Sequence, residues 1–74
     1  MKTTYMIEIM KNGSVVATTD EHDDIKTLQN WIHGNYPGSI KIPVSPYEYD
    51  KFWVVDKYQS KDSTMLIRKR MILE

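Results

Sequence analysis

Residues 23–33 read DDIKTLQNWIH, and they hold the only convincing helical pattern in the 74-residue chain. Ile25, Leu28 and Ile32 recur at intervals of three and four residues, which places them along one stripe of an α-helix. Trp31 borders this stripe. Whatever sheet the flanking residues form therefore has one predicted helix to cover its apolar face.

The ends of this helix are marked by residues that suit helix termini. The carboxylate of Asp23 or Asp24 can accept a backbone N–H of the first turn, and the positive end of the helix dipole favours it there. His33 falls in the last turn, and Gly34 can take the left-handed conformation that closes a helix. We therefore predict a helix over residues 23–33.

The N-terminal segment predicts a β-hairpin. Residues 3–10 alternate in the manner of a strand. Asn12-Gly13 follows at once, and both residues tolerate the positive φ that a two-residue type I′ turn requires. Residues 15–19 then form the returning strand, so the hairpin is predicted to cover residues 3–19.

The two-residue turn also predicts which side chains share a face of this hairpin. It places Ile9 opposite Val16 and Ile7 opposite Thr18, on the side expected to meet the helix. The other side would then collect Met6, Glu8, Met10, Val15 and Ala17. This face is more apolar than a face turned to water normally is. Scattered surface hydrophobes are common, but such a patch is also typical of a protein-binding surface.

The segment after the helix, residues 34–50, predicts little regular structure. Pro37-Gly38 fits a tight turn, in which Pro fixes φ and Gly supplies a positive φ. Pro43 and Pro46 remove donors that a ladder of strands needs. We expect an edge strand or a surface loop here.

The C-terminal part predicts a second hairpin over residues 51–73. Residues 51–58 and 64–73 alternate as strands, and residues 59–63 are polar turn material. Both faces of the last strand carry apolar side chains. Such a strand is central in its sheet or pairs with something outside the monomer.

Together these elements predict an α+β fold with a single domain over residues 1–74. The order ββαββ is most simply satisfied by two layers, with one helix packed on a mainly antiparallel four-stranded sheet. Ten basic and ten acidic side chains cancel, with a net charge of −2 over residues 1–40 and +2 over the remainder. The fold itself does not assign a function.

Composition excludes several classes of site and of compartment. The chain has no cysteine, so a disulfide framework, a thiolate zinc site and a thiol nucleophile are all excluded. It has no run of about 18 apolar residues to span a membrane, and its N-terminus lacks the apolar region of a secretory signal. We therefore expect a cytoplasmic protein with no membrane partner.

The strongest candidate for metal or acid–base chemistry is Asp20-Glu21-His22-Asp23-Asp24. Its spacing fits no calcium loop, and acidic residues are favoured at a helix N-terminus in any case. His22 and His33 lie about 16 Å apart along the helix, too far to share one ion. The serines and glycines form neither a nucleophile elbow nor a phosphate loop. We expect no enzyme activity, no metal and no cofactor.

A basic and aromatic C-terminal hairpin suggests a second class of function. Aromatic rings that stack bases beside cations that meet phosphates are typical of single-stranded nucleic-acid binding. The candidates are Trp53, Lys57, Tyr58, Arg68 and Arg70. Strand alternation, however, puts Lys57 on the face opposite the two arginines, and a solvated strand explains the same charges.

The leading hypothesis is a small non-enzymatic protein-binding module. One helix covers only one side of a sheet whose strands are apolar on both sides, so a surface remains for another protein or a second copy of the chain. Small virus-encoded proteins that inhibit or bind a host factor are often of this size and kind, so a virus-encoded inhibitor or adaptor is one form of this hypothesis. Single-stranded nucleic-acid binding is the alternative.

Overall fold

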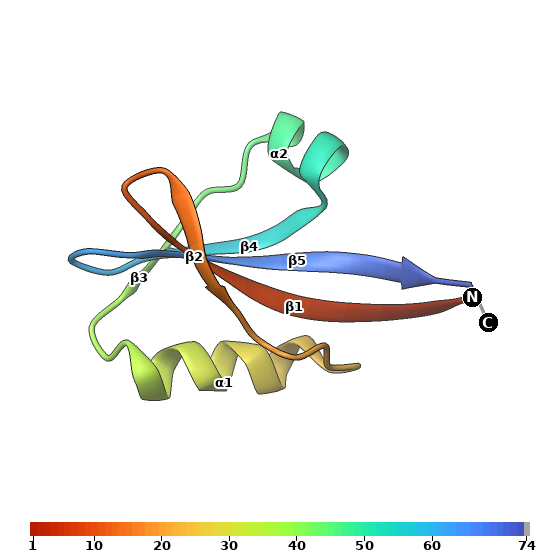
Figure 1. Cartoon of the computed structure of the whole chain (residues 1–74), viewed down its shortest axis with the longest axis horizontal. Coiled ribbons are helices and arrows are strands. Elements are labelled where there is room, and N and C mark those ends of the chain that lie inside the picture. Colours follow the sequence, from red (N-terminus) through yellow and green to blue (C-terminus); the bar gives the residue numbers. More distant parts are fainter. Residues whose placement is uncertain (74) are drawn as a thin grey trace.

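The computed structural model describes residues 1–73, which form a five-stranded antiparallel sheet with two helices (Figure 1). In chain order the elements are β1 (Lys2–Lys11), β2 (Ser14–Thr18), α1 (Ile25–Asn35), β3 (Ile40–Ile42), α2 (Pro46–Phe52), β4 (Val54–Gln59) and β5 (Thr64–Ile72). The strand order is β2-β1-β5-β4-β3. The last long strand, β5, is therefore central.

The predicted four-stranded sheet with one helix in ββαββ order is wrong. The segment 34–50, expected to be irregular or an edge strand, supplies both the edge strand β3 and most of α2. Pro46 is compatible with α2 because it stands at the start of the helix, where an N–H has no partner to lose. The strand of the last hairpin consequently begins at Val54 instead of Lys51.

The two edge strands are connected across one face of the sheet. Because every neighbouring pair of strands is antiparallel, β2 and β3 run in the same direction at opposite edges. The chain between them contains α1, which lies along one face, while α2 lies on the other side of the sheet (Figure 1). The sheet thus has a face covered by an 11-residue helix and a face met only by a 7-residue helix.

The hydrophobic core lies between α1 and the sheet. Leu28 and Ile32 of α1 are buried, as the helical stripe predicts. The sheet contributes Ile7, Ile9, Tyr58, Met65 and Ile67 to the same cluster. The helix is confirmed two residues further along than predicted: Asp24 caps it, with its carboxylate accepting from the Lys26 N–H at 3.0 Å. Gly34 lies inside the helix and does not close it; Tyr36 is the C-cap.

Two β-bulges decide which side chains share a face. The pairing of β1 with β2 steps from Ile9–Ala17 to Met10–Val15, so Val16 is an extra residue. The pairing of β4 with β5 steps in the same way and leaves Val55 as the extra residue. The predicted partners Ile9–Val16 and Ile7–Thr18 are therefore wrong, although Asn12 and Gly13 do form the expected turn with φ of 53° and 79°.

Candidate functional site

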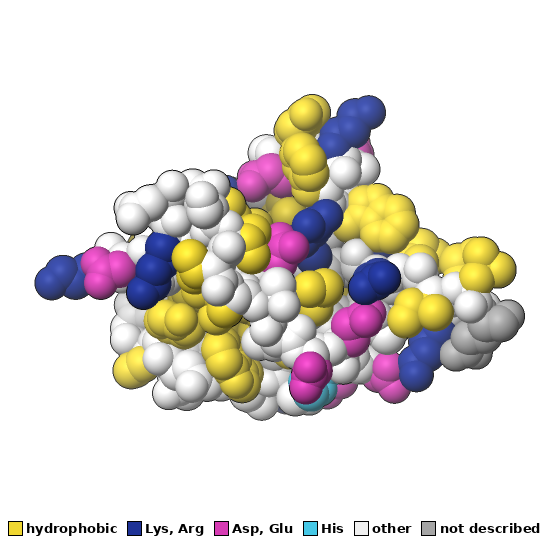
Figure 2. Space-filling view, in the orientation of Figure 1, with side chains coloured by type: hydrophobic (Ala, Val, Ile, Leu, Met, Phe, Trp, Pro, Cys, Tyr) yellow, Lys and Arg dark blue, Asp and Glu magenta, His cyan; other side chains and the backbone are white. Residues whose placement is uncertain are grey.

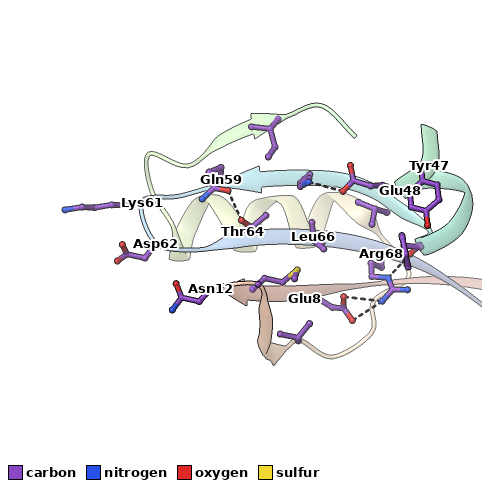
Figure 3. Close-up of a pocket in the computed structure, with 17 residues that line it drawn as sticks. Glu8, Asn12, Tyr47, Glu48, Gln59, Lys61, Asp62, Thr64, Leu66 and Arg68 are labelled. Carbon is purple, nitrogen blue, oxygen red and sulfur yellow. Dashed lines mark hydrogen bonds and ion pairs between the residues drawn. The ribbon is translucent and has the colours of Figure 1, made fainter. Parts of the chain in front are cut away.

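The face of the sheet opposite α1 carries an open groove of about 660 Å³ (Figure 3). Strands β1, β5 and β4 form its floor, the β1–β2 hairpin forms one wall and α2 the other. Its apolar lining is Met10, Val15, Ile42, Tyr47, Phe52, Val54 and Leu66. Leu66 and Val54 are buried, whereas Val15 and Phe52 are 49% and 48% exposed. The groove therefore has a packed floor and accessible apolar walls.

The hairpin wall follows from the turn and the bulge. A bulge increases the local twist and bends the strand that carries it. In Figure 1 the β1–β2 turn lies on the same side of the sheet as α2. Thr19 holds the shifted register: its N–H donates to the Ile7 carbonyl at 3.0 Å, and its hydroxyl accepts from the Ile7 N–H at 3.0 Å. Met10 and Val15 lie opposite each other at the tip end of the groove.

The α2 wall is built by a capping box. The Ser45 hydroxyl accepts from the Glu48 N–H at 3.1 Å, and the Glu48 carboxylate accepts from the Ser45 N–H at 3.2 Å. Trp53 ends the helix in the left-handed conformation, with φ 57° and ψ 33°, which turns the chain into β4. None of the residues of α2 is buried, so its aromatic side chains remain accessible. Figure 2 shows hydrophobic side chains exposed over this helix, beside side chains of both charges.

Four of the charged side chains that line the groove form two oppositely charged pairs (Figure 3). Arg68 Nη1 donates to both oxygens of Glu8 at 3.2 and 3.1 Å, and Arg68 Nε donates to the Phe52 carbonyl at 2.7 Å. Lys57 Nζ lies 2.9 Å from Glu48 Oε2. The hydrogen bond from Lys57, followed by that from the Ser45 backbone, lowers the pKa of Glu48 below its ordinary value. Arg68 thus ties together β1, β5 and the end of α2.

The groove gathers three of the five predicted protein-binding residues. Glu8, Met10 and Val15 line it. Met6 lies on the same face one row further along, opposite Arg68. Ala17 lies opposite Ile9, on the α1 side of the sheet, because the bulge at Val16 reverses the alternation beyond it.

The predicted nucleic-acid residues do not form one exposed surface. Tyr58 is only 3% exposed, and its ring meets the His33 ring edge-on at a centroid distance of 5.8 Å. The bulge at Val55 turns Lys57 onto the face of Arg68, which corrects the expectation that they lie on opposite faces.

The remaining candidates are either paired or peripheral. Arg70 Nη1 lies 3.5 Å from Glu21 Oε2. Trp53 is partly exposed at the end of α2. The three basic candidates of this hairpin, Lys57, Arg68 and Arg70, therefore each meet a carboxylate of the same chain.

The sequence reasoning missed the α2 wall, which contributes Tyr47, Glu48 and Phe52 to the groove. A signal for it was present. Ser45 is followed three residues later by Glu48, which is the spacing of a capping box, and Pro46 stands at the position that favours Pro in a helix.

A buried polar cluster on the α1 side has a structural explanation. Asp56 is buried; its carboxylate accepts from Gln29 Nε2 at 2.7 Å and lies 3.2 Å from Lys41 Nζ. The hydrogen bond to Asp56 raises the pKa of Lys41. Burial, and then the charge of Asp56, raise the pKa of Tyr58. These contacts join α1, β3 and β4.

The acidic segment before α1 is engaged in contacts with β1 and β5. Glu21 accepts a hydrogen bond from the Thr4 hydroxyl at 2.6 Å, and Asp23 lies 3.3 Å from Lys2 Nζ. His22 pairs through its backbone with Tyr5. In residues 1–73 we find no group of three or more His, Cys, Asp or Glu side chains placed to hold a metal ion.

Comparison with known proteins adds no relative: no family model, no curated protein and no solved structure matches the chain. Within the described part of the chain, neither helix is long and apolar enough to cross a membrane.

Proposed function

We propose that this chain is a non-enzymatic protein-binding module and that the groove opposite α1 is its binding surface. The observation that carries the proposal is the exposure of apolar walls around a packed floor, on a sheet face that α2 covers at one end only. Removing apolar surface from water contributes about 25 cal/mol per Å². A partner that fills the groove would therefore gain free energy by binding.

The residue types in the groove support a protein partner. Aromatic side chains are enriched among residues that dominate binding energy, and Tyr47 and Phe52 pack edge-on with ring centroids 5.5 Å apart. Met10 offers a flexible contact that adapts to different shapes. We propose that the chain acts as an inhibitor or adaptor by occupying a surface of its partner.

The charges of the groove support an apolar occupant over a nucleic acid. Lys57 and Arg68 lie 2.9 and 3.1 Å from carboxylates of the same chain. A phosphate would have to displace these carboxylates before it could gain either cation. We therefore do not propose nucleic-acid binding as the function.

The experiment is affinity capture with two matched variants of neighbouring residues. Val15→Asp places a charge in the groove, whereas Val16→Asp places the same charge at the bulge; Val15 and Val16 are 49% and 56% exposed, and only Val15 lines the groove. The tagged wild type and the Val16 variant should retain the same partner from an extract of the source cell. The Val15 variant should lose it.

Two results would count against the proposal. One is a set of captured proteins that is identical for all three forms of the chain. The other is salt-sensitive binding to single-stranded oligonucleotides in fluorescence anisotropy at ~50 mM salt, where phosphate contacts are strong. Thermal unfolding of each variant serves as the folding control.

A further inference from the structure

The groove floor offers side chains but no backbone partners. β1, β5 and β4 each have a neighbouring strand on both sides, so their N–H and C=O groups over the floor are used within the sheet. A partner segment that enters the groove must satisfy its own backbone groups, because burying them without partners is costly. An extended segment finds free backbone groups only at the edge strands β2 and β3.

The pairing registers place the apolar side chains of the groove on a diagonal. Val15 and Met10 are paired at one end, Leu66 lies one row further on β5, and Val54 lies one row beyond it on β4. Phe52 of α2 borders the far end of this diagonal. Figure 3 shows Leu66 between the Asn12 end of the groove and Tyr47 of α2. We name this row, Val15, Met10, Leu66, Val54 and Phe52, the apolar diagonal. Its ends are accessible, with Val15 and Phe52 49% and 48% exposed, whereas Leu66 and Val54 are buried beneath them.

Polar pairs flank the apolar diagonal on both sides. The Glu8–Arg68 pair lies on one side, and the Lys57–Glu48 pair lies on the other. Each side of the diagonal therefore presents one acidic and one basic group. An occupant with an apolar stripe would place that stripe against the apolar diagonal. Polar residues on both sides of the stripe would then lie beside the flanking charged pairs.

The length of the diagonal sets the length of the occupant. The diagonal crosses the intervals between four neighbouring strands, which lie ~4.8 Å apart. Along the strands it advances two rows of two residues each, at ~3.4 Å per residue, so its length is about 20 Å. A helix rises about 1.5 Å per residue, so ~13 residues, or between three and four turns, cover it. α1, with 11 residues and a stripe of apolar side chains, covers the opposite face in the same manner.

We propose that the occupant of the groove is an amphipathic α-helix of the partner protein, about three to four turns long, whose apolar stripe lies along the apolar diagonal. This inference rests on the proposed function and specifies the partner segment. A helix satisfies its own backbone within one continuous segment while it presents side chains at the spacing of about one turn to a sheet face.

The test uses two display libraries of 14-residue peptides with the same amino-acid composition. One library places apolar residues at helical spacing, every third or fourth position, and the other places them at every second position. After selection against the intact chain, enriched peptides are synthesised, and their affinity is measured by anisotropy. Circular dichroism reports helix formation on binding.

Binders should come from the helical library and gain helix signal when bound. Their affinity should fall at least tenfold with Val15→Asp and with Phe52→Ala, which lie at opposite ends of the apolar diagonal. Val16→Asp and Tyr49→Ala are the matched controls and should change affinity less than twofold, because neither Val16 nor Tyr49 lines the groove.

The outcomes separate this inference from the proposed function. Binders that come only from the alternating library, or that stay non-helical when bound, would overturn the helical occupant. Failure of both libraries, with a captured cellular partner still sensitive to Val15→Asp, would also overturn the helix but leave the protein-binding function standing. Failure of both libraries together with no groove-dependent partner would overturn both.

Discussion

At the scale of the residue, Arg68 has the most structural consequence on the open face. Its guanidinium joins Glu8 of β1 to the carbonyl of Phe52 at the end of α2. A planar guanidinium has donors in a fixed fork, whereas a lysine ammonium is a compact point charge that cannot reproduce this geometry. Through these contacts Arg68 joins elements of the groove that are distant in sequence.

We expect Arg68→Lys to destabilise the chain by about 1 kcal/mol, since hydrogen bonds to charged groups contribute about 1.5–3 kcal/mol and partial exposure reduces their effect. Urea unfolding followed by fluorescence measures this change. Lys11→Arg, at an exposed position at the end of β1, is the control and should leave the midpoint unchanged. A midpoint for Arg68→Lys equal to that of the wild type would show that charge alone suffices at this position.

The pKa of Tyr58 predicts a loss of stability at alkaline pH. Burial raises this pKa above its ordinary value of 10.0, so the neutral phenol is favoured in the folded chain. A group with a raised folded-state pKa contributes its full stability below the unfolded value and loses it as the pH rises through the folded value. The free energy of unfolding should therefore decrease above pH 10.0.

The same buried cluster adds a second alkaline contribution. The pKa of Lys41 is also raised, by its hydrogen bond to Asp56, and has the same sign of effect. Tyr58→Phe should make the free energy of unfolding decrease less steeply with pH. The decrease that remains should be the contribution of Lys41. Denaturant midpoints between pH 9 and about 11.5 span the ordinary pKa values of both groups. A Tyr58→Phe profile as steep as that of the wild type would contradict the assignment.

At the scale of the element, local signals predicted what local contacts determine. Ile25, Leu28 and Ile32 recur every three or four residues within a single helix. Asn12-Gly13 forms the β1–β2 turn without contacts from distant residues. Both were predicted, because each depends on neighbours within a few residues. The capping box before α2 is equally local, and it was missed because Pro43 and Pro46 were interpreted as breakers over the whole segment.

The bulges could not be predicted from alternation. Val15 and Val16 are both β-branched and apolar, so the pattern of β2 looks the same with or without an extra residue. The register is decided by the bonds of Thr19 to Ile7, which lie at the far end of the strand. The face on which Ala17 lies follows from this distant contact, as the face of Lys57 follows from the bulge at Val55.

The short helix α2 should loosen in acid. The pKa of Glu48 is lowered by Lys57 and by the Ser45 backbone, so these contacts stabilise α2 above the ordinary glutamate value of 4.5 and are lost as the pH falls through the lower folded value. Amide hydrogen exchange in α2 should accelerate in that range, relative to the intrinsic rates. Glu48→Gln should remove this pH dependence while β1 and β5 keep their protection. Equal protection of α2 at all acidic pH values would contradict this role of Glu48.

At the scale of the whole molecule, the chain has one tightly packed face and one open face. The core against α1 contains the fully buried side chains of Ile7, Leu28 and Ile32. The open face has Leu66 and Val54 beneath accessible walls. Stability and the proposed binding are therefore assigned to opposite sides of the same sheet, which allows changes in one with little effect on the other.

Leu28→Ala should accordingly reduce the free energy of unfolding by about 3 kcal/mol, in the range for buried leucine truncations. This is a large part of the total for so small a domain. Phe52→Ala should cost less than about 1 kcal/mol, since its side chain is half exposed and scattered surface positions contribute little. Thermal unfolding of the two variants tests this division. If both variants lost the same free energy of unfolding, Phe52 in the groove wall would contribute to stability as much as the buried core does, which would contradict this division.

Binding in the groove is tested most directly by amide NMR mapping of the chain with its captured partner or a selected peptide. We expect shifts concentrated in α2 and in the strand residues that line the groove, Glu8, Met10, Val15, Thr64, Leu66 and Arg68. The amides of α1 should change little. Shifts concentrated on α1, or along the outer edge of β3, would contradict the claim that the open face of the sheet is the binding surface.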